Sequence, residues 1–231
     1  MSDTTQYKGY TIKIEQDEIP LNPRTDWDNL GTLVCFNRRN NIGDENQPKS
    51  PEALLCALSL STNDEWEQAA LNDVRLHRSP QEFMAELDKL NHVIYLPVYL
   101  LDHSGITIRT DSSMFRACDP QGWDWGWAGI IYITKEKAKK EYGWKVINKQ
   151  RIAKLKEYLE GEIETLDQYI TGDVYYYQIT NPDGEDTDSC SGYYGHDYEK
   201  NGLLEQARNA IDCDIAHRLK TEGVQQELVL A

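Results

Sequence analysis

Short stretches of strand-forming residues recur along the chain, and the first of them alternates hydrophobic and polar positions with the two-residue period of a half-buried β-strand. This first stretch places Tyr10, Ile12 and Ile14 on one face. Pro97 lies in a longer stretch, which is therefore expected at a sheet edge or beside a bulge. Turn residues indicate that two pairs of strands form hairpins. The further predicted strands cover residues 32–39, 92–103, 106–110, 128–134, 173–180 and 187–195.

Other segments repeat hydrophobic residues every three or four positions, which is the pattern of an amphipathic α-helix. Ser79 and Glu82 have the spacing of a capping box and start a helix. Thr134 is suited to begin another helix as its N-cap, and Gly143 is suited to end it. One predicted helix begins at Pro51. The others cover residues 61–72, 79–91, 135–142, 149–170 and 203–219.

The order of these elements predicts an α+β fold. Because the strands cluster in hairpins instead of alternating with helices, we expect an antiparallel or mixed sheet packed with several helices. These helices include a long one near 149–170 and a C-terminal one. With 231 residues, of which 39% are hydrophobic, the chain can bury a substantial core. We expect a single domain over residues 1–231, with a weak internal boundary near 143–149.

Charge is distributed very unevenly along the chain, whose net charge is −15. Residues 135–156 hold 9 Lys and Arg against 2 Asp and Glu, whereas residues 157–231 hold 4 against 17. The overall charge disfavours direct binding of nucleic acid, because an acidic protein is repelled by phosphates. We interpret the basic segment 135–156 as two solvated helix faces. Since it also contains Tyr142 and Trp144, a patch that contacts phosphates is the alternative.

Features of membrane, secreted and metal-binding proteins are missing from the sequence. The longest apolar stretch covers residues 93–101, whereas a membrane span needs roughly 20 apolar residues. The N-terminus lacks a signal-peptide pattern, so we expect a cytoplasmic protein that does not bind membranes. The five cysteines include no closely spaced pair, and neither disulfides nor a zinc ribbon is indicated. No cofactor or metal is predicted.

Several short motifs resemble catalytic or metal-binding sites, but a structural role explains each of them. Asp102, His103 and Ser104 contain the residue types of a hydrolase triad, although adjacent strand residues point to opposite faces, and we assign them to a turn. Cys213 and His217 lie one helical turn apart and lack a third metal ligand. The acidic loop from residue 183 lacks the glycine and the glutamate that an EF-hand requires.

Three tryptophans at alternate positions precede the predicted strand 128–134. In an extended segment Trp123, Trp125 and Trp127 would share one face. Buried there, they would contribute to the core; exposed, they would be strong anchors for a partner. We expect them to be mostly buried, with a partner surface as the alternative.

Several blocks of the chain resemble the recurrent segments of a largely uncharacterised family of small acidic proteins carried by bacteriophages and plasmids. The blocks are "PRTDWDNLGTLVCFNRRNNIGDE", "LPVYLLDHSGITIRT", "GIIYITKEKAKKEYG", "LDQYITGDVYYYQI" and "DSCSGYYG", and together they reach from Pro23 to Gly195. The resemblance implies an origin in a mobile element. By analogy, an acidic protein of such an element is often an inhibitor of a host defence enzyme that acts on nucleic acid.

Two functional hypotheses follow. The first is a non-enzymatic protein that imitates DNA with an acidic surface and thereby inhibits a host restriction or CRISPR effector. Its candidate partner-binding residues are Glu157, Glu160, Glu164, Asp167, Asp183, Glu185, Asp186, Asp188, Trp123 and Trp125. The alternative is a metal-dependent enzyme that acts on nucleotides or nucleic acid. Its candidate site residues are His103, Asp102, Asp26, Asp28 and Asp124.

Overall fold

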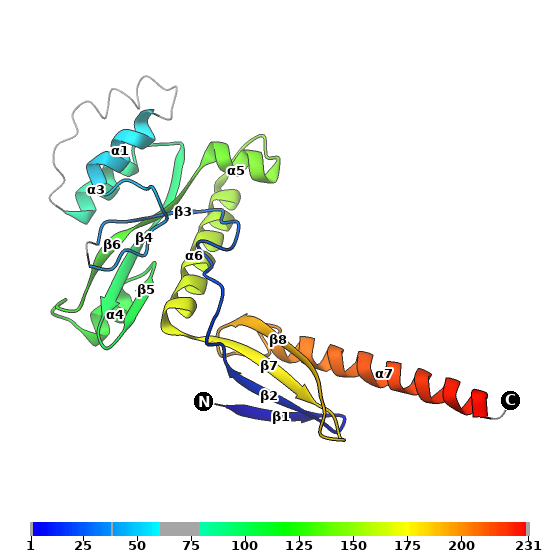
Figure 1. Cartoon of the computed structure of the whole chain (residues 1–231). Coiled ribbons are helices and arrows are strands. Elements are labelled where there is room, and N and C mark those ends of the chain that lie inside the picture. Colours follow the sequence, from blue (N-terminus) through cyan, green and yellow to red (C-terminus); the bar gives the residue numbers. More distant parts are fainter. Residues whose placement is uncertain (1, 38, 61–78, 230–231) are drawn as a thin grey trace. The chain divides into compact units, whose positions relative to one another are not determined.

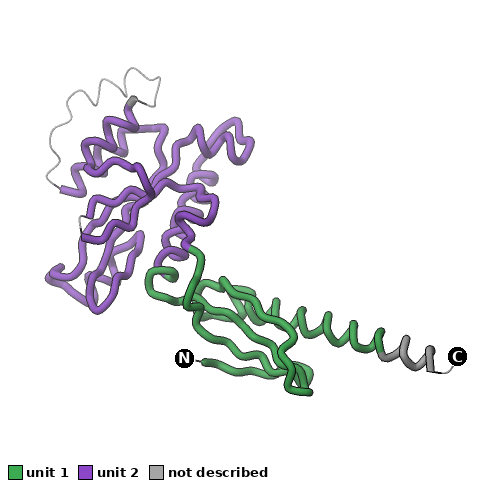
Figure 2. The backbone as a smooth tube through the Cα atoms, in the orientation of Figure 1, with its two compact units in different colours: residues 1–21, 168–231 green, residues 22–167 purple. Residues whose placement is uncertain are grey.

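The computed structural model describes residues 2–37, 39–60 and 79–229 (Figure 1). Contacts divide the chain into two compact units, which are coloured separately in Figure 2. Unit 1 consists of residues 1–21 and 168–231, and unit 2 of residues 22–167. The division therefore does not fall near 143–149, and the single domain over 1–231 stays a prediction. The helix predicted over 61–72 lies outside the described residues.

Unit 2 is built on an antiparallel sheet with the strand order β3-β6-β4-β5. These strands are β3 (Thr32–Cys35), β6 (Trp125–Thr134), β4 (Val93–Asp102) and β5 (Ile106–Arg109). The short strand β5 pairs with β4 only from Tyr99 onward, so Pro97 lies where β4 has a single neighbour. A register shift follows between Val98 and Tyr99. The predicted bulge is therefore found beside Pro97, whereas β4 is an inner strand of the sheet and not an edge strand.

Helices cover both faces of this sheet (Figure 1). On one face, Val34 and Ile130 pack against α1 (Pro51–Leu60) and α3 (Pro80–Leu87), which supply a cluster of buried leucines and Phe83. The other face meets α6 (Lys149–Thr171). Gly31 lies between the two, because a Cβ there would come within 2.5 Å of Leu159 on α6 and 2.8 Å of Ile131 on β6. Alternate strand residues therefore serve two separate cores.

The helix ends follow the local signals of the sequence. Ser79 and Glu82 form both hydrogen bonds of the predicted capping box at the start of α3. Thr134 caps α5 (Lys135–Tyr142), and Gly143 ends it in the left-handed conformation with a φ of 65°. The structure also contains α4 (Ser113–Cys118), a stretch that the sequence patterns left as a loop. Its apolar side chain Phe115 is buried.

Unit 1 is a second antiparallel sheet, with the order β1-β2-β7-β8 and one covering helix. Its elements are β1 (Asp3–Tyr7), β2 (Tyr10–Gln16), β7 (Val174–Thr180), β8 (Asp186–Tyr194) and α7 (Leu203–Val229). Ile12, Tyr177 and Ile179 face Leu203 and Ala207 of α7 in a buried cluster. The opposite face carries polar side chains. The strand β1 was not predicted, because its sequence DTTQY contains no hydrophobic alternation.

The described residues thus form six helices and two antiparallel sheets, which confirms the predicted α+β fold. Both hairpins and the long helix at 149–170 are present as expected, and the C-terminal helix reaches ten residues further than residue 219. Among the described residues, no helix combines the length and apolar character needed to cross a membrane.

Candidate functional site

Negative charge is concentrated in unit 1. Residues 1–21 and 168–231 hold 16 Asp and Glu against 6 Lys and Arg, a net charge of −10, whereas residues 22–167 carry −5. Four of the six cations of unit 1 are already engaged by carboxylates of the same unit. These pairs are Lys8–Asp212, Lys13–Glu15, Arg208–Glu199 and Arg218–Asp183. The unit therefore offers a cationic partner many carboxylates and little competing positive charge.

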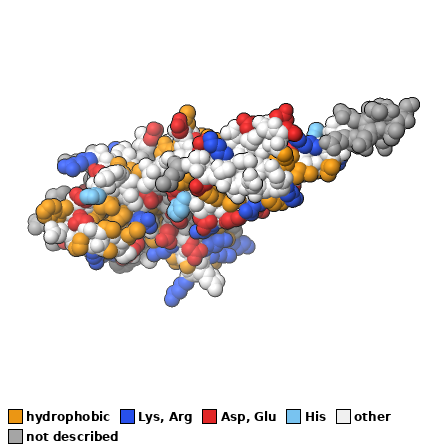
Figure 3. All heavy atoms as spheres, turned by 90° about the horizontal axis from the view of Figure 1, so that it is seen from below, with side chains coloured by type: hydrophobic (Ala, Val, Ile, Leu, Met, Phe, Trp, Pro, Cys, Tyr) orange, Lys and Arg blue, Asp and Glu red, His pale blue; other side chains and the backbone are white. Residues whose placement is uncertain are grey.

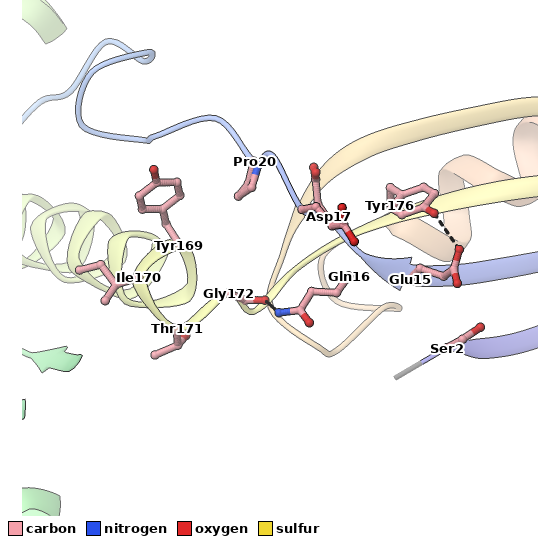
Figure 4. A pocket seen from close by; sticks show the side chains of 11 residues that line it. Ser2, Glu15, Gln16, Asp17, Pro20, Tyr169, Ile170, Thr171, Gly172 and Tyr176 are labelled. Atoms are coloured by element: carbon pink, nitrogen blue, oxygen red, sulfur yellow. Dashed lines mark hydrogen bonds between the residues drawn. The ribbon is translucent and has the colours of Figure 1, made fainter. Parts of the chain in front are cut away.

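A groove of about 1150 Å³ lies beside the ends of β2 and β7 in unit 1 (Figure 4). Glu15, Asp17 and Glu18 line it together with the rings of Tyr169 and Tyr176. The Tyr176 hydroxyl donates to Glu15 at 2.7 Å, and this bond, followed by that from a lysine, holds the pKa of Glu15 below its usual range. The groove is therefore anionic at neutral pH, with two aromatic rings in its wall.

The acidic hairpin loop of unit 1 is held by internal contacts. Arg218 on α7 donates to Asp183 at 3.1 Å and lies 3.9 Å from Glu185. Asp186 accepts hydrogen bonds from two polar side chains of β7. Asp188 accepts one from Tyr177, and burial together with the charge of Asp188 raises the pKa of that tyrosine. All four predicted partner-binding acids of this loop thus also contribute to the local structure.

The four predicted acids on α6 lie in unit 2 and follow each other at spacings of three and four residues, which places them on one stripe of the helix. Glu157 and Glu164 are exposed and form no hydrogen bond or ion pair within the described chain. Glu160 accepts a hydrogen bond from Thr110. Asp167 accepts the backbone N–H of Ile108 at 2.8 Å, on the edge strand β5. This last contact satisfies a donor that would otherwise be left open at a sheet edge.

A turn organised by Asp119 presents two of the tryptophans. Its carboxylate accepts backbone N–H groups of residues 121–124, and these bonds, that of Asp124 first, hold the pKa of Asp119 below its usual range. The Trp125 indole donates to the Asp119 carbonyl at 2.7 Å. Trp123 is 82% exposed. Figure 3 shows hydrophobic side chains on the molecular surface interspersed with acidic and basic ones.

The expectation that the three tryptophans are mostly buried is wrong for Trp123, whereas Trp127 is partly buried against the core. Trp127 packs against Phe36 and Phe83 in the core below α1 and α3. Trp125 is half-buried. Strand β6 begins only at Trp125, so Trp123 belongs to the preceding turn and does not share the face of the strand. The alternating sequence pattern did not reveal this boundary.

A cleft of about 360 Å³ adjoins the exposed indole and is lined by two residues of the enzymatic hypothesis, Asp102 and Asp124. His103 Nδ1 lies 2.7 Å from the Asp124 carboxylate. Asp102 accepts a hydrogen bond from Asn40 at 3.1 Å. Ser104 lies in the turn between β4 and β5, with a φ of 58°, in agreement with the predicted turn. The structure thus forms a histidine–carboxylate pair beside a polar cleft.

The other two residues of that hypothesis lie elsewhere, in the loop before β3. Asp26 accepts the backbone N–H of Asn22 at 2.7 Å, and Asp28 does not line the cleft. Within the described ranges, no group of three or more His, Cys, Asp or Glu side chains is arranged to hold a metal ion. The carboxylates of the enzymatic hypothesis therefore do not converge into a metal centre in the described part of the chain.

One buried cluster escaped the sequence patterns. The Arg24 side chain donates twice to Asp44, at 2.8 and 2.7 Å, and once to Glu162, at 2.7 Å. Glu162 also accepts the backbone N–H groups of Leu30 and Gly31. Burial alone would lower the pKa of Arg24, but the two carboxylates raise it above its usual value. This cluster fixes the 22–31 loop to α6 and has a structural role.

Comparison with models of known protein families, with curated proteins and with solved structures finds no match to this chain.

Proposed function

We propose that this protein is a non-enzymatic binding protein whose unit 1 engages a basic surface of a nucleic-acid-handling partner. The observation that carries the proposal is the charge of −10 on unit 1, most of whose cations are already paired internally. Such a surface attracts proteins that have evolved to hold phosphates, and electrostatic steering accelerates the encounter.

The groove of Figure 4 is suited to lysine or arginine side chains of that partner. Glu15, Asp17 and Glu18 would pair with the cationic heads, while the rings of Tyr169 and Tyr176 offer aromatic faces to them. Carboxylates in this role replace the phosphates of nucleic acid. The proposal therefore assigns the imitation of DNA to unit 1, and to this groove in particular.

The resemblance to phage and plasmid proteins suggests which partners to test first. A mobile element that enters a bacterial cell meets restriction and CRISPR effectors, whose nucleic-acid grooves are basic. We propose such a defence effector as the partner and inhibition as the outcome. The resemblance and the acidic groove together support the choice of a defence effector as the partner.

Capture from a bacterial lysate with the full chain tests the proposal. At low salt we expect a basic nucleic-acid enzyme that moderate salt releases and added duplex DNA displaces. The combined substitution Glu15→Gln, Asp17→Asn and Glu18→Gln should weaken its affinity by between about five-fold and about 150-fold, because each exposed charge pair contributes up to about 1 kcal/mol.

A matched variant removes three charges from the α6 stripe instead, with Glu157→Gln, Glu160→Gln and Glu164→Gln. Affinity for the captured partner should then change much less than with the groove variant. Loss of binding with the α6 variant and retention with the groove variant would overturn the assignment to unit 1. Capture that neither salt nor duplex DNA reverses would argue against imitation of DNA altogether.

A second candidate function is supported by the hydrogen bond of 2.7 Å between His103 and Asp124 beside the 360 Å³ cleft. A carboxylate that orients a histidine can assist general acid–base catalysis on a nucleotide or nucleic acid. A nuclease and nucleotide-hydrolysis screen, together with metal analysis, tests this function. Activity that disappears in both His103→Ala and Asp124→Asn would favour the enzyme, and no activity in the unsubstituted chain would remove it.

A further inference from the structure

Unit 2 carries a basic and aromatic surface, in contrast to the acidic unit 1. It is formed by α5, the following turn and the first half of α6, within residues 135–158. Residues 135–156 contribute nine Lys and Arg against only Glu136 and Glu141. None of these nine cations forms an ion pair with an acid of the described chain. The side chains of Lys137 and Arg151 donate hydrogen bonds to backbone carbonyls instead.

Three aromatic rings are stacked at the centre of this surface. Tyr142 and Trp144 lie with ring centroids 4.4 Å apart and an interplanar angle of 17°. Tyr158 continues the stack, at 6.1 Å and 25° from Tyr142. Arg151 lies over the Trp144 ring at 4.7 Å, and Lys154 lies over Tyr158 at 5.6 Å. Cations therefore flank a row of nearly parallel rings.

The stack depends on tertiary structure and remains accessible. Arg151, Lys154 and Tyr158 follow at spacings of three and four residues and so form one stripe of α6, while Gly143 turns the chain so that Trp144 returns to Tyr142. Tyr158 is 43% exposed, and the other two rings are half-buried. The rings are thus partly accessible to a ligand.

The stability of α6 does not explain this arrangement. Its first turn contains Lys149 and Arg151 and no acid, although the helix dipole favours acids at this end. Carboxylates in the first turn would stabilise the helix. The acids Glu157, Glu160 and Glu164 lie instead further along α6, on a different stripe. The basic residues oppose the dipole and lack carboxylate partners, which is expected where an anionic ligand supplies the missing charge.

We propose that this surface binds single-stranded nucleic acid. Cations would hold the phosphates, and the stacked rings with Arg151 would receive unstacked bases. A duplex hides the faces of its bases, so the rings favour a single strand over a duplex. The net charge of −15 argues against such binding on average, but exposed charges act over only about 8 Å at physiological salt. The local charge at α5 and α6 is positive.

Fluorescence anisotropy with a labelled oligo-dT of about 12 nucleotides tests the proposal on the full chain at low salt. Binding should be tighter than to a duplex of the same length. Trp144→Ala should weaken it by between about five-fold and about 150-fold, the usual effect of losing one stacked base. Arg151→Gln with Lys154→Gln should reduce the slope of log affinity against log salt by about 1.4.

Matched substitutions elsewhere on unit 2 serve as controls. Trp27→Ala removes another exposed indole, and Lys49→Gln with Lys89→Gln removes two other cations; all of these should leave affinity within about two-fold. Trp144→Phe keeps a stacking plane and should retain most of the affinity.

Circular dichroism checks that each variant is folded, and Tyr158→Ala replaces Trp144→Ala if the latter is not. The proposal would be overturned by absence of oligonucleotide binding or by equal affinity for the duplex. An equal loss of affinity in the control variants would overturn it as well.

Discussion

Removal of the Arg24 side chain tests whether the buried cluster joins the loop 22–31 to the rest of unit 2. The Arg24 side chain is 6% exposed, and the side chains of its partners Asp44 and Glu162 are 21% and 17% exposed. Arg24→Met keeps much of the volume of the side chain while removing every hydrogen bond that it donates. Two carboxylates are then left in a largely buried place without their counterion.

The structure indicates the size of the effect. Arg24 makes three short hydrogen bonds to carboxylates and a fourth, at 3.0 Å, to the Gly31 carbonyl. Charged hydrogen bonds contribute about 1.5–3 kcal/mol each, but two of these belong to one bidentate pair and burial of the charges offsets part of the gain. Breaking a buried ion pair by removing one partner costs about 3–5 kcal/mol. We expect the free energy of unfolding of unit 2 to fall by this amount.

Urea unfolding followed by tryptophan fluorescence measures this change, because all six tryptophans lie in residues 22–167 and the signal reports on unit 2 alone. With a slope of about 2 kcal/mol per molar urea, the midpoint should fall by about 2 M. Adding Asp44→Asn and Glu162→Gln to Arg24→Met should recover part of the loss, since the uncompensated charges disappear. A loss below about 1 kcal/mol for Arg24→Met would refute the reasoning, because that is the scale of a solvated surface pair.

Three further predictions concern single side chains. Asp167→Ala should destabilise unit 2 by about 1–3 kcal/mol in the same urea assay, because an edge N–H loses its acceptor, whereas Glu164→Ala on the same stripe should change stability by less than about 0.5 kcal/mol. Gly143→Ala should cost about 1 kcal/mol through its positive φ and should weaken the near-ultraviolet dichroism of the aromatic stack. Because the pKa of Asp119 is lowered in the folded protein, its ionised carboxylate stabilises the turn 119–124 fully above about pH 4. This stabilisation is lost as the pH falls through the lowered pKa. Indole fluorescence from the adjoining turn should follow this titration in acid, and Asp119→Asn should abolish it.

Local signals in the sequence predicted the helix ends well. The capping box at Ser79 and the pair Thr134 and Gly143 act within a few residues, so the residue types alone indicate where a helix begins or ends. The 149–170 helix was equally clear from its repeat of hydrophobic residues. By contrast, β1 was missed because its polar residues gain their strand conformation by pairing with β2.

The candidate sites were only partly predictable. Asp102 and His103 were singled out, but their proximity to Asp124 depends on the pairing of β4 with β6. The cluster of Arg24 was not predicted, because its partners Asp44 and Glu162 lie 20 and 138 residues away in the sequence. No pattern within a short window can show such a cluster. Tyr142 and Trp144 were noted in the basic segment, but their stacking with Tyr158 depends on the tertiary structure.

The sequence by itself determined the α+β class, the positions of most helices and strands and the separation of basic from acidic segments, because periodicity, caps and charge are properties of neighbouring residues. Only the tertiary structure decided that the chain divides into two units, that Trp123 is exposed while Trp127 packs partly buried against the core, and that Tyr142, Trp144 and Tyr158 stack between cations. These features depend on strand register and helix packing. They are set by the burial of side chains that are distant in sequence, and that burial is a property of the whole fold.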